Sequence, residues 1–300
     1  MQNPNIDIGT YGIWTATLDA QLSAAAADAV AELDDLGFGA VWIPETVFRE
    51  PFVHAALLLA GSTRIKVATG IVNRYGRDPL ACNAAMQTLN EAFPGRFLLG
   101  LGVSHEHLVS WLRKHDYSKP YSGMVEYLDA MDSARFFAPV GDPPAQMVLA
   151  ALGPRMLRLA AERTAGALPY FVPPEHTAIA RTTMGPEPLL AVEQMVVFDA
   201  DPTTARDTAR QHMAVYLKAP NYTNNLARLG FGPEDVADGG SDRLVDAVVA
   251  WGSVDSALTR VQAHLDAGAD HVCIQVLDPD GSRMPMQEWN ELSSALGLSA

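Results

Sequence analysis

The chain has 300 residues, of which 48% are hydrophobic and 19% charged, and its 21 Lys and Arg against 35 Asp and Glu give a formal net charge of −14. This composition predicts a folded globular protein with a large core rather than a disordered chain. The excess of negative charge excludes a general affinity for nucleic acid or anionic lipid, because both are themselves negatively charged. No stretch approaches the ~20 apolar residues of a membrane span. The polar start of the chain lacks the basic and apolar regions of a signal peptide, so we expect a cytoplasmic protein.

The two cysteines predict neither a disulfide nor a metal site. Cys82 lies in a helical pattern and Cys273 in a strand pattern, whereas both kinds of site need closely spaced sets of ligands or an even framework of pairs. We therefore expect both thiols in the core and no bound metal.

Eight short apolar stretches have the length and residue types of β-strands. In chain order they cover residues 6–14, 40–43, 65–71, 97–103, 147–151, 165–170, 189–198 and 271–277. Helical patterns between them cover residues 18–36, 51–60, 79–93 and 254–265. Gly37 directly follows the first of these helices and Gly268 lies three residues beyond the last one, both as helix-ending glycines, and Asp78 precedes another as its N-cap.

Strands that alternate with amphipathic helices pair in parallel through right-handed crossovers. Eight such units close most naturally into a (β/α)8 TIM barrel of the α/β class, and a doubly wound open sheet is the main rival. Two long connections, residues 104–146 after the fourth strand and 200–270 after the seventh, are predicted to be insertions, the second with helices over one barrel end. No internal repeat or long linker interrupts the pattern, so residues 1–300 are predicted to form a single domain.

Ligands of such barrels bind at the carboxyl ends of the strands. The polar and aromatic residues at or after the predicted strand ends are Trp14, Glu45, Asn73, Arg74, Ser104, His105, Glu106, His107, Gly153, Pro154, Arg155, Tyr170, Glu193, Gln275 and Asp278. The functional site is expected among them.

The segment LAALGPRMLRLAAE, residues 149–162, joins a predicted strand to a helix through a glycine. Gly153 lets the backbone approach a ligand closely, and Pro154 begins the helix. The free N–H groups of that helix suit a phosphate, to which Arg155 would add positive charge. A plain strand-to-helix turn, with a glycine for tight packing, explains the same residues equally well.

The segment GRFLLGLGVSHEHLV, residues 95–109, ends the fourth predicted strand in two histidines. It is not a dinucleotide fingerprint, because His105 occupies the third glycine position, and its two glycines instead indicate a close approach by backbone or ligand. His105 and His107 lack a third ligand at metal-binding spacing, and Ser104 lacks the elbow of a serine nucleophile. His105 is either a general acid or base or a histidine that only lines the barrel rim.

Glu45 follows the second predicted strand and allows two interpretations. It is a buried acid that orients a ligand, or a carboxylate that caps the helix of the next segment. Its place at a strand end favours the ligand role.

Several longer stretches resemble the luciferase-like superfamily of flavin and deazaflavin enzymes, and more narrowly its actinobacterial branch that uses the deazaflavin coenzyme F420. These stretches include GIWTATLD, GFGAVWIPE, ATGIVNRYGRDPLACNAAMQTLNEAFPGRFLLGLG, ALGPRMLRLAAERTAGALPYFVPPEHT, GSDRLVDAVVAWG and AGADHVCIQVL. The resemblance covers nearly the whole chain and implies a (β/α)8 barrel with insertions. It also implies a homodimer.

The resemblance implies two groups of cofactor contacts. The family holds the cofactor ring against a bulge with a non-prolyl cis peptide after strand three, which here corresponds to Gly70, Ile71, Val72 and Asn73. The family's phosphate cradle corresponds to Ala151, Leu152, Gly153 and Pro154, with Ser104 and Arg155 as further contacts.

The implied activity is hydride transfer between C5 of the deazaflavin and a small organic substrate, accompanied by a proton. Sugar-phosphate dehydrogenases of the family place a histidine after strand two and a glutamate after strand four. This chain instead has Glu45 at the first position and His105 or Glu106 at the second, which argues against a sugar-phosphate substrate. His105 is expected to handle the proton, because an imidazole titrates near neutral pH, with Glu45 and Glu106 as lesser candidates.

Two alternative functions remain. One is an FMN-dependent monooxygenase on the same barrel, in which reduced flavin activates oxygen, and the other is a cofactor-binding barrel without turnover. Lys218 or Arg228 near the cofactor tail would favour the longer, anionic deazaflavin coenzyme over FMN. The aromatic residues that indicate an apolar or aromatic substrate, unless they belong to the core, are Trp14, Tyr75, Trp111, Tyr170 and Tyr222.

Overall fold

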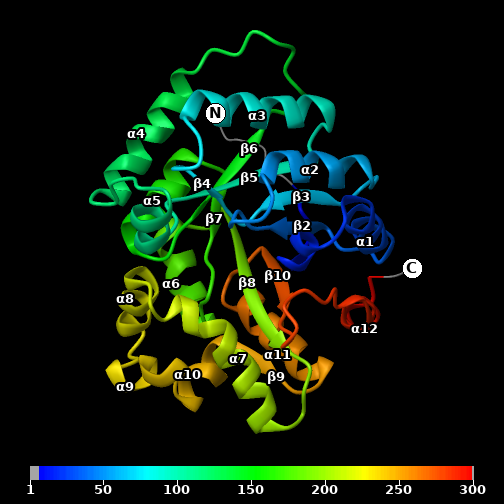
Figure 1. The fold of residues 1–300 in the computed structure, drawn as a ribbon, viewed down its shortest axis with the longest axis vertical. Coiled ribbons are helices and arrows are strands. Elements are labelled where there is room, and N and C mark those ends of the chain that lie inside the picture. Colours follow the sequence, from blue (N-terminus) through cyan, green and yellow to red (C-terminus); the bar gives the residue numbers. More distant parts are fainter. Residues whose placement is uncertain (1–6, 299–300) are drawn as a thin grey trace.

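The strands of the protein form a closed parallel barrel with helices around it (Figure 1). The computed structural model describes residues 7–298. Its strands are β1 (Tyr11–Trp14), β2 (Ala40–Ile43), β3 (Lys66–Thr69), β4 (Val72–Asn73), β5 (Phe97–Gly102), β6 (Gln146–Ala150), β7 (Gly166–Leu168), β8 (Leu189–Val197), β9 (Val249–Trp251) and β10 (His271–Val276).

The helices are α1 (Ser23–Asp35), α2 (Pro51–Ala60), α3 (Pro79–Ala92), α4 (Pro120–Ser133), α5 (Pro154–Arg163), α6 (Pro174–Met184), α7 (Pro202–Tyr216), α8 (Pro220–Arg228), α9 (Pro233–Val236), α10 (Asp242–Val248), α11 (Val254–Asp266) and α12 (Met286–Leu296). Three short helical turns accompany them: η1 (Thr17–Ala20), η2 (Leu108–Leu112) and η3 (Ala237–Gly239).

Eight of the strands make the barrel, in the order β1, β2, β3, β5, β6, β7, β8 and β10. The barrel closes because β10 pairs in parallel with both β8 and β1. This closure confirms the predicted TIM barrel and excludes the open doubly wound sheet. That residues 1–300 form one domain stays a prediction.

Two short strands were missed by the sequence prediction. The predicted strand 65–71 is β3 followed by a bulge at Gly70 and Ile71, beyond which β4 pairs separately with the end of β5. Strand β9 lies inside the predicted second insertion and pairs with the last three residues of β8. Strands of two or three residues are too short to show an alternating pattern. The predicted first strand, residues 6–14, begins at Tyr11, and its residue 6 lies outside the described residues.

The predicted helix 18–36 is in fact two elements, η1 and α1. They separate at Gln21, whose extended backbone (φ −93°, ψ 162°) interrupts the helical path. The predicted ends are confirmed: Gly37 and Gly268 follow their helices at φ +86° and +101°, a region that glycine enters without a Cβ clash. The predicted N-cap is also confirmed, since the Asp78 carboxylate accepts two backbone N–H groups of α3.

The two glycines at the end of β5 let the bulge lie against this strand. A Cβ added to Gly100 would lie 1.8 Å from the carbonyl oxygen of Thr69, and one added to Gly102 would lie 2.6 Å from Cδ1 of Ile71. The Thr69 hydroxyl donates to the Gly100 carbonyl and accepts from the Gly100 N–H, at 2.9 and 2.8 Å. These glycines therefore provide backbone clearance, as the sequence indicated.

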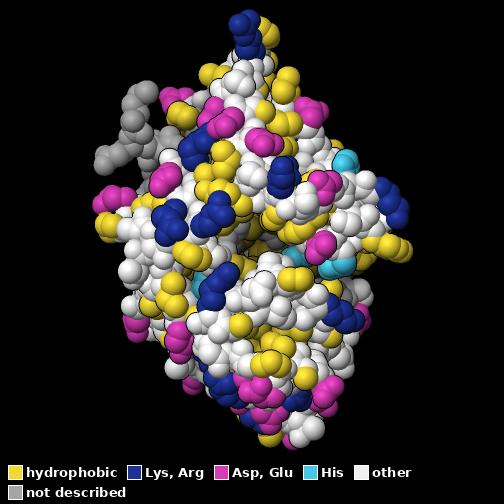
Figure 2. Space-filling model, turned by 90° about the vertical axis from the view of Figure 1, so that its left-hand side faces the viewer, with side chains coloured by type: hydrophobic (Ala, Val, Ile, Leu, Met, Phe, Trp, Pro, Cys, Tyr) yellow, Lys and Arg dark blue, Asp and Glu magenta, His cyan; other side chains and the backbone are white. Residues whose placement is uncertain are grey.

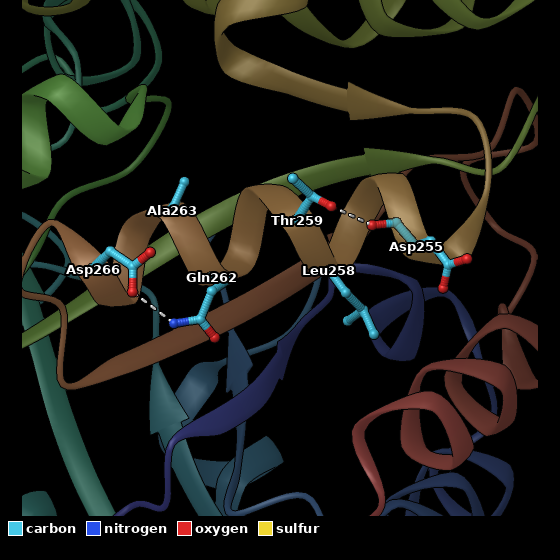
Figure 3. Close-up of a pocket in the computed structure, with 6 residues that line it drawn as sticks. All are labelled: Asp255, Leu258, Thr259, Gln262, Ala263 and Asp266. Atoms are coloured by element: carbon cyan, nitrogen blue, oxygen red, sulfur yellow. Dashed lines mark hydrogen bonds between the residues drawn. The ribbon is translucent and has the colours of Figure 1, made fainter.

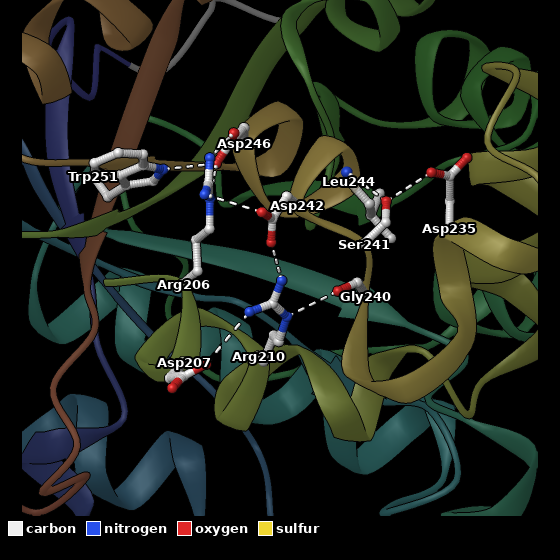
Figure 4. A network of polar contacts seen from close by, with 10 residues as sticks. All are labelled: Arg206, Asp207, Arg210, Asp235, Gly240, Ser241, Asp242, Leu244, Asp246 and Trp251. Atoms are coloured by element: carbon white, nitrogen blue, oxygen red, sulfur yellow. Dashed lines mark hydrogen bonds and ion pairs between the residues drawn. The ribbon is translucent and has the colours of Figure 1, made fainter. Parts of the chain in front are cut away.

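A network of ion pairs joins the elements of the second insertion to one another (Figure 4). Arg206 on α7 pairs with Asp246 at 2.6 Å and with Asp242 at 3.0 Å, and Arg210 also pairs with Asp242. The indole of Trp251 on β9 donates to Asp246 at 2.8 Å. Through these contacts α7, α10 and β9 form one packed unit.

Both cysteines are buried in the structure, as predicted. Within residues 7–298 no helix is long and apolar enough to cross a membrane. In the same part of the chain, no three His, Cys, Asp or Glu side chains gather in a way that could hold a metal ion.

Candidate functional site

A cavity of about 780 Å³ opens at the carboxyl ends of the barrel strands. Figure 2 shows one face of the molecule hollowed near its centre, with hydrophobic side chains in the hollow and Lys and Arg side chains around it. The cavity lies within the ~300–1,000 Å³ range of small-molecule and cofactor sites. The residues singled out from the sequence that line it are Trp14, Glu45, Gly70, Ile71, Asn73, Ser104, His105, His107, Ala151, Leu152, Gly153, Pro154, Arg155, Tyr170, Tyr222 and Arg228.

Glu45 is buried in the cavity wall, and hydrogen bonds occupy its carboxylate. Oε2 accepts from the N–H of Asn73 at 2.6 Å and from Arg77 at 3.0 Å, while Oε1 accepts from Arg77 at 3.0 Å and from Arg113 at 3.1 Å. Four hydrogen bonds fill the acceptor capacity of a carboxylate. Burial would lower the pKa of Arg77, but the hydrogen bonds and charge of Glu45 raise it above its usual value.

This arrangement holds the bulge after β3 in place. The Glu45 N–H donates to the Ile71 carbonyl at 3.2 Å, in addition to the carboxylate contact with the Asn73 N–H. The helix-cap interpretation of Glu45 is wrong, because Glu50 caps α2 by accepting from the N–H of Val53. The alternative, a buried acid at the ligand cavity, agrees with the position of Glu45.

The bulge contains the non-prolyl cis peptide that the family resemblance implied, between Gly70 and Ile71. The indole N–H of Trp14 donates to the Gly70 carbonyl at 3.1 Å. A Cβ added to Gly70 would lie 2.5 Å from the same indole nitrogen. Glycine is therefore the residue that lets Trp14 and the bulge contact each other.

Helix α5 begins at the cavity with no side chain capping its N-terminus. Gly153 is its N-cap and Pro154 its first residue, so the predicted strand–glycine–helix turn is confirmed. Within 4 Å, a Cβ added to Gly153 would meet Arg228 Nη1 alone, at 3.7 Å. The Arg155 guanidinium lies 4.1 Å from the centre of the Tyr121 ring. Pro154 has no N–H, and the Met156 and Leu157 N–H groups donate to the Gly153 carbonyl at 3.1 and 3.0 Å. The Arg155 N–H at this helix start, together with the two guanidinium groups, favours an anion at this place.

The residues after β5 also line the cavity. Ser104 has φ +57°, and the Tyr117 hydroxyl donates to its carbonyl at 3.0 Å. The half-buried His105 ring lies 5.4 Å from the Tyr222 ring, and its Nδ1 is 3.4 Å from Oδ1 of Asn221. Burial lowers the pKa of His105, although the hydrogen bond to Asn221 opposes this effect. The ring is therefore neutral at pH 7.

Aromatic residues from β1 and from the segment 170–222 form a third wall. Ring centres of Trp14 and Tyr170 lie 5.2 Å apart, as do those of Tyr170 and Tyr216, and Tyr222 lies 5.3 Å from Tyr216. Burial raises the pKa of Tyr170 well above its usual value, so the phenol stays protonated. Its hydroxyl lies 2.9 Å from both the Tyr216 hydroxyl and Oε1 of Gln275.

Glu193 is a buried acid close to this wall. The sequence predicts Glu193 within a strand or near its end. In the structure it lies in the middle of β8, and its exposed fraction is 1%. Its Oε2 accepts from the N–H of Phe171 at 3.2 Å, and its Oε1 has no hydrogen-bond partner among the described residues. Burial raises the pKa of Glu193 to about 8, although the hydrogen bond from Phe171 opposes this effect.

Several predicted residues lie away from the cavity. Val72 is fully buried and Glu106 is exposed, and neither belongs to the described residues that line the cavity. Of the aromatic candidates, Trp111 is 74% exposed, and Tyr75 packs against Tyr117 outside the lining. The roles assigned to these residues stay predictions.

Sequence reasoning missed four residues of the site. Arg113, Tyr117 and Tyr216 line the cavity, and Arg77 pairs with Glu45 in its wall. Arg113 and Tyr117 come from the first insertion, and Tyr216 comes from the second. These three residues lie far from the strand ends in the sequence, so no local pattern marked them as part of the site. Arg77 could have been noticed from its position between Asn73 and the Asp78 cap.

A second hollow of about 590 Å³ lies along α11 (Figure 3). Its polar side chains bond within the helix itself: Gln262 donates to Asp266 at 2.8 Å, and Thr259 donates to the backbone carbonyl of Asp255 at 2.8 Å. These contacts are typical of a solvated helix face. The candidate site is therefore the cavity at the strand ends.

Two curated relatives share 26% identity with the chain. One is a 5,10-methylenetetrahydromethanopterin reductase of Methanolobus tindarius, aligned over 88% of this chain and 93% of the relative. The other is a protein of Mycobacterium tuberculosis named as a coenzyme F420-dependent oxidoreductase, aligned over 49% of this chain and 51% of the relative. The chain thus spans about half the length of the second relative.

Solved structures share the fold at low identity. An F420-dependent secondary alcohol dehydrogenase in complex with an F420–acetone adduct has a TM-score of 0.75 at 12% identity, covering 97% of this chain and 99% of that chain. A type II Baeyer–Villiger monooxygenase component from Pseudomonas putida, in complex with FMN, has a TM-score of 0.65 at 15% identity, covering 95% of each chain.

The family comparison covers most of the sequence. Residues 12–271 match the family described as luciferase-like monooxygenase. That span runs from the first barrel strand to the start of the last one. The chain therefore belongs to the luciferase-like monooxygenase family.

Proposed function

We propose that the protein is an F420-dependent oxidoreductase, which transfers a hydride between the deazaflavin and a small organic substrate. The proposal rests on three features that lie in one cavity. They are the bulge after β3, the uncapped start of α5, and a neutral histidine after the end of β5. The names of both curated relatives agree with it, since one is an F420-dependent oxidoreductase by name and the other a methylenetetrahydromethanopterin reductase.

The residues of the cavity fit such a cofactor. Gly70 and Ile71 would support its ring, because the bulge forms part of the cavity lining. Ala151, Leu152, Gly153 and Pro154, with Ser104 and Arg155 as further contacts, would bind its phosphate. The space above Gly153 and the nearby guanidinium of Arg228 suit that charge. When bound, the deazaflavin supplies hydride chemistry at its C5.

Titration of the purified protein with the deazaflavin coenzyme and with FMN, followed by fluorescence, tests this proposal. We expect tight binding of the deazaflavin coenzyme and weak binding of FMN, because two arginines next to the helix start suit the more anionic molecule. Tight binding of FMN alone would favour the monooxygenase alternative and overturn the proposal.

His105 is proposed to exchange a proton at the cavity mouth. Its ring lines the cavity and is neutral at pH 7, whereas the carboxylate of Glu45 is fully hydrogen-bonded. If it transfers a proton, His105→Asn lowers kcat by roughly 10²-fold or more, with the affinity for the deazaflavin coenzyme unchanged. Unchanged turnover of this variant would remove His105 from the proton step.

The substrate is proposed to be apolar. Val47, Leu112 and Val215 line the cavity and are 69%, 44% and 50% exposed, so apolar groups form part of its rim. A second copy of the chain is proposed as a partner on the basis of the family resemblance. Light scattering of the purified protein would give the mass of the assembly, and a monomer at micromolar concentration would contradict this part of the proposal.

A further inference from the structure

The Tyr170 hydroxyl is shared among three acceptors. It lies 2.9 Å from the Tyr216 hydroxyl, 2.9 Å from Oε1 of Gln275 and 3.2 Å from Nε2 of His212. A phenol has one proton to donate, so this hydroxyl can direct it to only one of these atoms at a time. The family resemblance assigns no role to His212, and the function proposed above does not use it.

Gln275 contacts both Tyr170 and His212. Its Oε1 lies 2.9 Å from the Tyr170 hydroxyl, and its side-chain nitrogen lies 3.4 Å from His212 Nε2. An amide nitrogen can only donate, so this orientation of the amide matches a neutral His212 with its ring proton on Nδ1 and Nε2 as the acceptor. Burial lowers the pKa of His212 to about 4, so the ring is neutral at pH 7. Nε2 is thus able to accept the Tyr170 proton.

Tyr170, Gln275 and His212 form a path from the cavity towards the outside of the barrel. Tyr170 lines the cavity, and its ring packs against Trp14, which in turn bonds the bulge at Gly70. His212 lies on α7 and is only half-buried. No hydrogen-bond partner for its Nδ1 lies among the described residues, and the residue is partly exposed, so solvent is the proton acceptor that a relay through this ring requires.

The titratable groups next to this path are uncharged at neutral pH. Tyr216 on α7 and Tyr222 on α8 are phenols, and burial raises the pKa of Tyr216 to about 12. A charge on Glu193 of β8 would raise the pKa of the same tyrosines. Its carboxyl is mainly protonated at pH 7, because burial raises its pKa to about 8. No fixed charge among the described neighbours therefore holds the proton at one point of the path.

We propose that Tyr170 and His212, oriented by Gln275, form a proton relay between the cavity and solvent. When an alcohol is oxidised, the O–H bond of the substrate breaks and its proton passes to the Tyr170 oxygen. In the same step the Tyr170 proton moves to His212 Nε2. The hydrogen on the substrate carbon leaves with its electron pair as the hydride of the proposed function, on which this inference rests, so a carbonyl results. The imidazolium then releases its Nδ1 proton to solvent, which leaves the remaining ring proton on Nε2. Exchange with solvent must move this proton to Nδ1 before the next turnover, so that Nε2 can accept again.

The relay specifies the substrate class as an alcohol or the corresponding carbonyl compound. A phenol next to the cavity can exchange a proton with a substrate oxygen without forming a free phenolate, since the two transfers are coupled. Tyr170 is the catalytic residue of the relay, and His212 and Gln275 are positioning residues that act through it. Oxidation of an alcohol releases one proton, so this relay replaces His105 as the route for it. His105 contacts Tyr222 rather than Tyr170 in the described structure, so a loss of kcat in His105→Asn with none in Tyr170→Phe would overturn the relay.

Nuclear magnetic resonance of the cofactor-free protein, labelled in its histidines, tests the geometry. We expect the Nδ1–H tautomer for His212 and a pKa below the usual 6.5. In Tyr170→Phe the hydroxyl that stabilises the neutral ring is lost, so the pKa of His212 should rise. Tyr222→Phe is the matched control, because it removes a phenol from the same cavity but not from His212. An Nε2–H tautomer, or equal pKa values in the two variants, would overturn the relay.

Turnover of a panel of apolar primary and secondary alcohols, with the deazaflavin coenzyme bound, tests the chemistry. Tyr170→Phe and His212→Ala should each lower kcat by roughly 10²-fold while KM changes little. Added imidazole should restore part of the rate to His212→Ala but none to Tyr170→Phe. Unchanged kcat in both variants, or no rescue of His212→Ala, would overturn the relay.

The two proposals fail in different ways. Failure to bind the deazaflavin coenzyme overturns the proposed function, while the tautomer and pKa of His212 are measured without any cofactor. Binding of the coenzyme without turnover of any alcohol in the panel leaves the proposed oxidoreductase standing and overturns the substrate class named here.

Discussion

The two sides of the cavity carry their polar groups in opposite ways. On the side of β2 and the bulge, the Glu45 carboxylate pairs with Arg77 and Arg113 and also accepts from the Asn73 N–H, so that every acceptor site is used. On the side of β7, α7 and β10, Tyr170 and His212 are uncharged and share one proton among several acceptors.

This difference indicates that one side of the cavity fixes geometry and the other passes on a proton. A paired carboxylate fixes geometry, because removing one partner leaves a charge buried without compensation. A neutral hydroxyl next to a neutral imidazole can pass a proton on, because the hydroxyl is both a donor and an acceptor and the imidazole has one acceptor nitrogen. We therefore assign Glu45 to holding the bulge rather than to the proton-transfer role it was given as a lesser candidate.

Removal of the Glu45 carboxylate should have the largest effect. Glu45→Ala leaves Arg77 without its buried partner and the Asn73 N–H without its acceptor. We expect a loss of about 3–5 kcal/mol in the free energy of unfolding, measured by urea denaturation, and weaker binding of the deazaflavin coenzyme.

The matched control is Glu50→Gln. Glu50 pairs with the same Arg77 at 3.1 Å but is 47% exposed, and glutamine keeps an oxygen to cap α2. We expect a change of at most about 1 kcal/mol, as for other exposed ion pairs. Equal losses in the two variants would mean that burial of the Glu45 pair is not what stabilises this side.

Glu193 on the uncharged side should contribute less to stability as the pH rises. Its carboxyl has a pKa of about 8 in the fold against 4.5 in the unfolded chain, so the unfolded chain releases its proton first. The contribution of Glu193 to the free energy of unfolding therefore falls between pH 4.5 and 8 and is constant on either side of this window. Between pH 5 and pH 8 we expect this contribution to fall by roughly 3 kcal/mol.

Glu193→Gln removes this titration while keeping an oxygen for the N–H of Phe171. Urea denaturation at the two pH values should then show a difference smaller by that amount than in the unmodified protein. The same pH difference in both proteins would contradict the assignment of Glu193 as the buried neutral acid.

Most of the barrel could be predicted from the sequence because its signals are local. Apolar strands, the Asp78 cap and the glycines after two helices depend on neighbouring residues alone. The turn at Gly153 was equally well explained by packing, and it gained a functional meaning only through the family resemblance. Strand β9 was not predicted, because three residues are too few to show an alternating pattern. It forms by pairing with the end of β8.

The side chains that complete the site could not be predicted in the same way. Arg113 reaches Glu45 across 68 residues of sequence, and Tyr170 reaches Gln275 across 105. Such contacts depend on closure of the barrel and on the path of the insertions, neither of which leaves a local pattern. The acid at a strand end was visible in the sequence, but the arginines that occupy its oxygens were not.

Arg228 offers the smallest effect and a test of the anion site at α5. Arg228→Gln removes a guanidinium next to Gly153, so we expect roughly tenfold weaker binding of the deazaflavin coenzyme at low salt and a smaller effect at high salt. Binding of the phosphate-free deazaflavin riboside should not change. Lys218→Gln is the control, because Lys218 is an exposed cation of the same insertion that does not line the cavity. If Lys218→Gln weakens binding as much as Arg228→Gln, the effect comes from overall charge rather than from contact at Gly153, and the start of α5 is not where the phosphate binds.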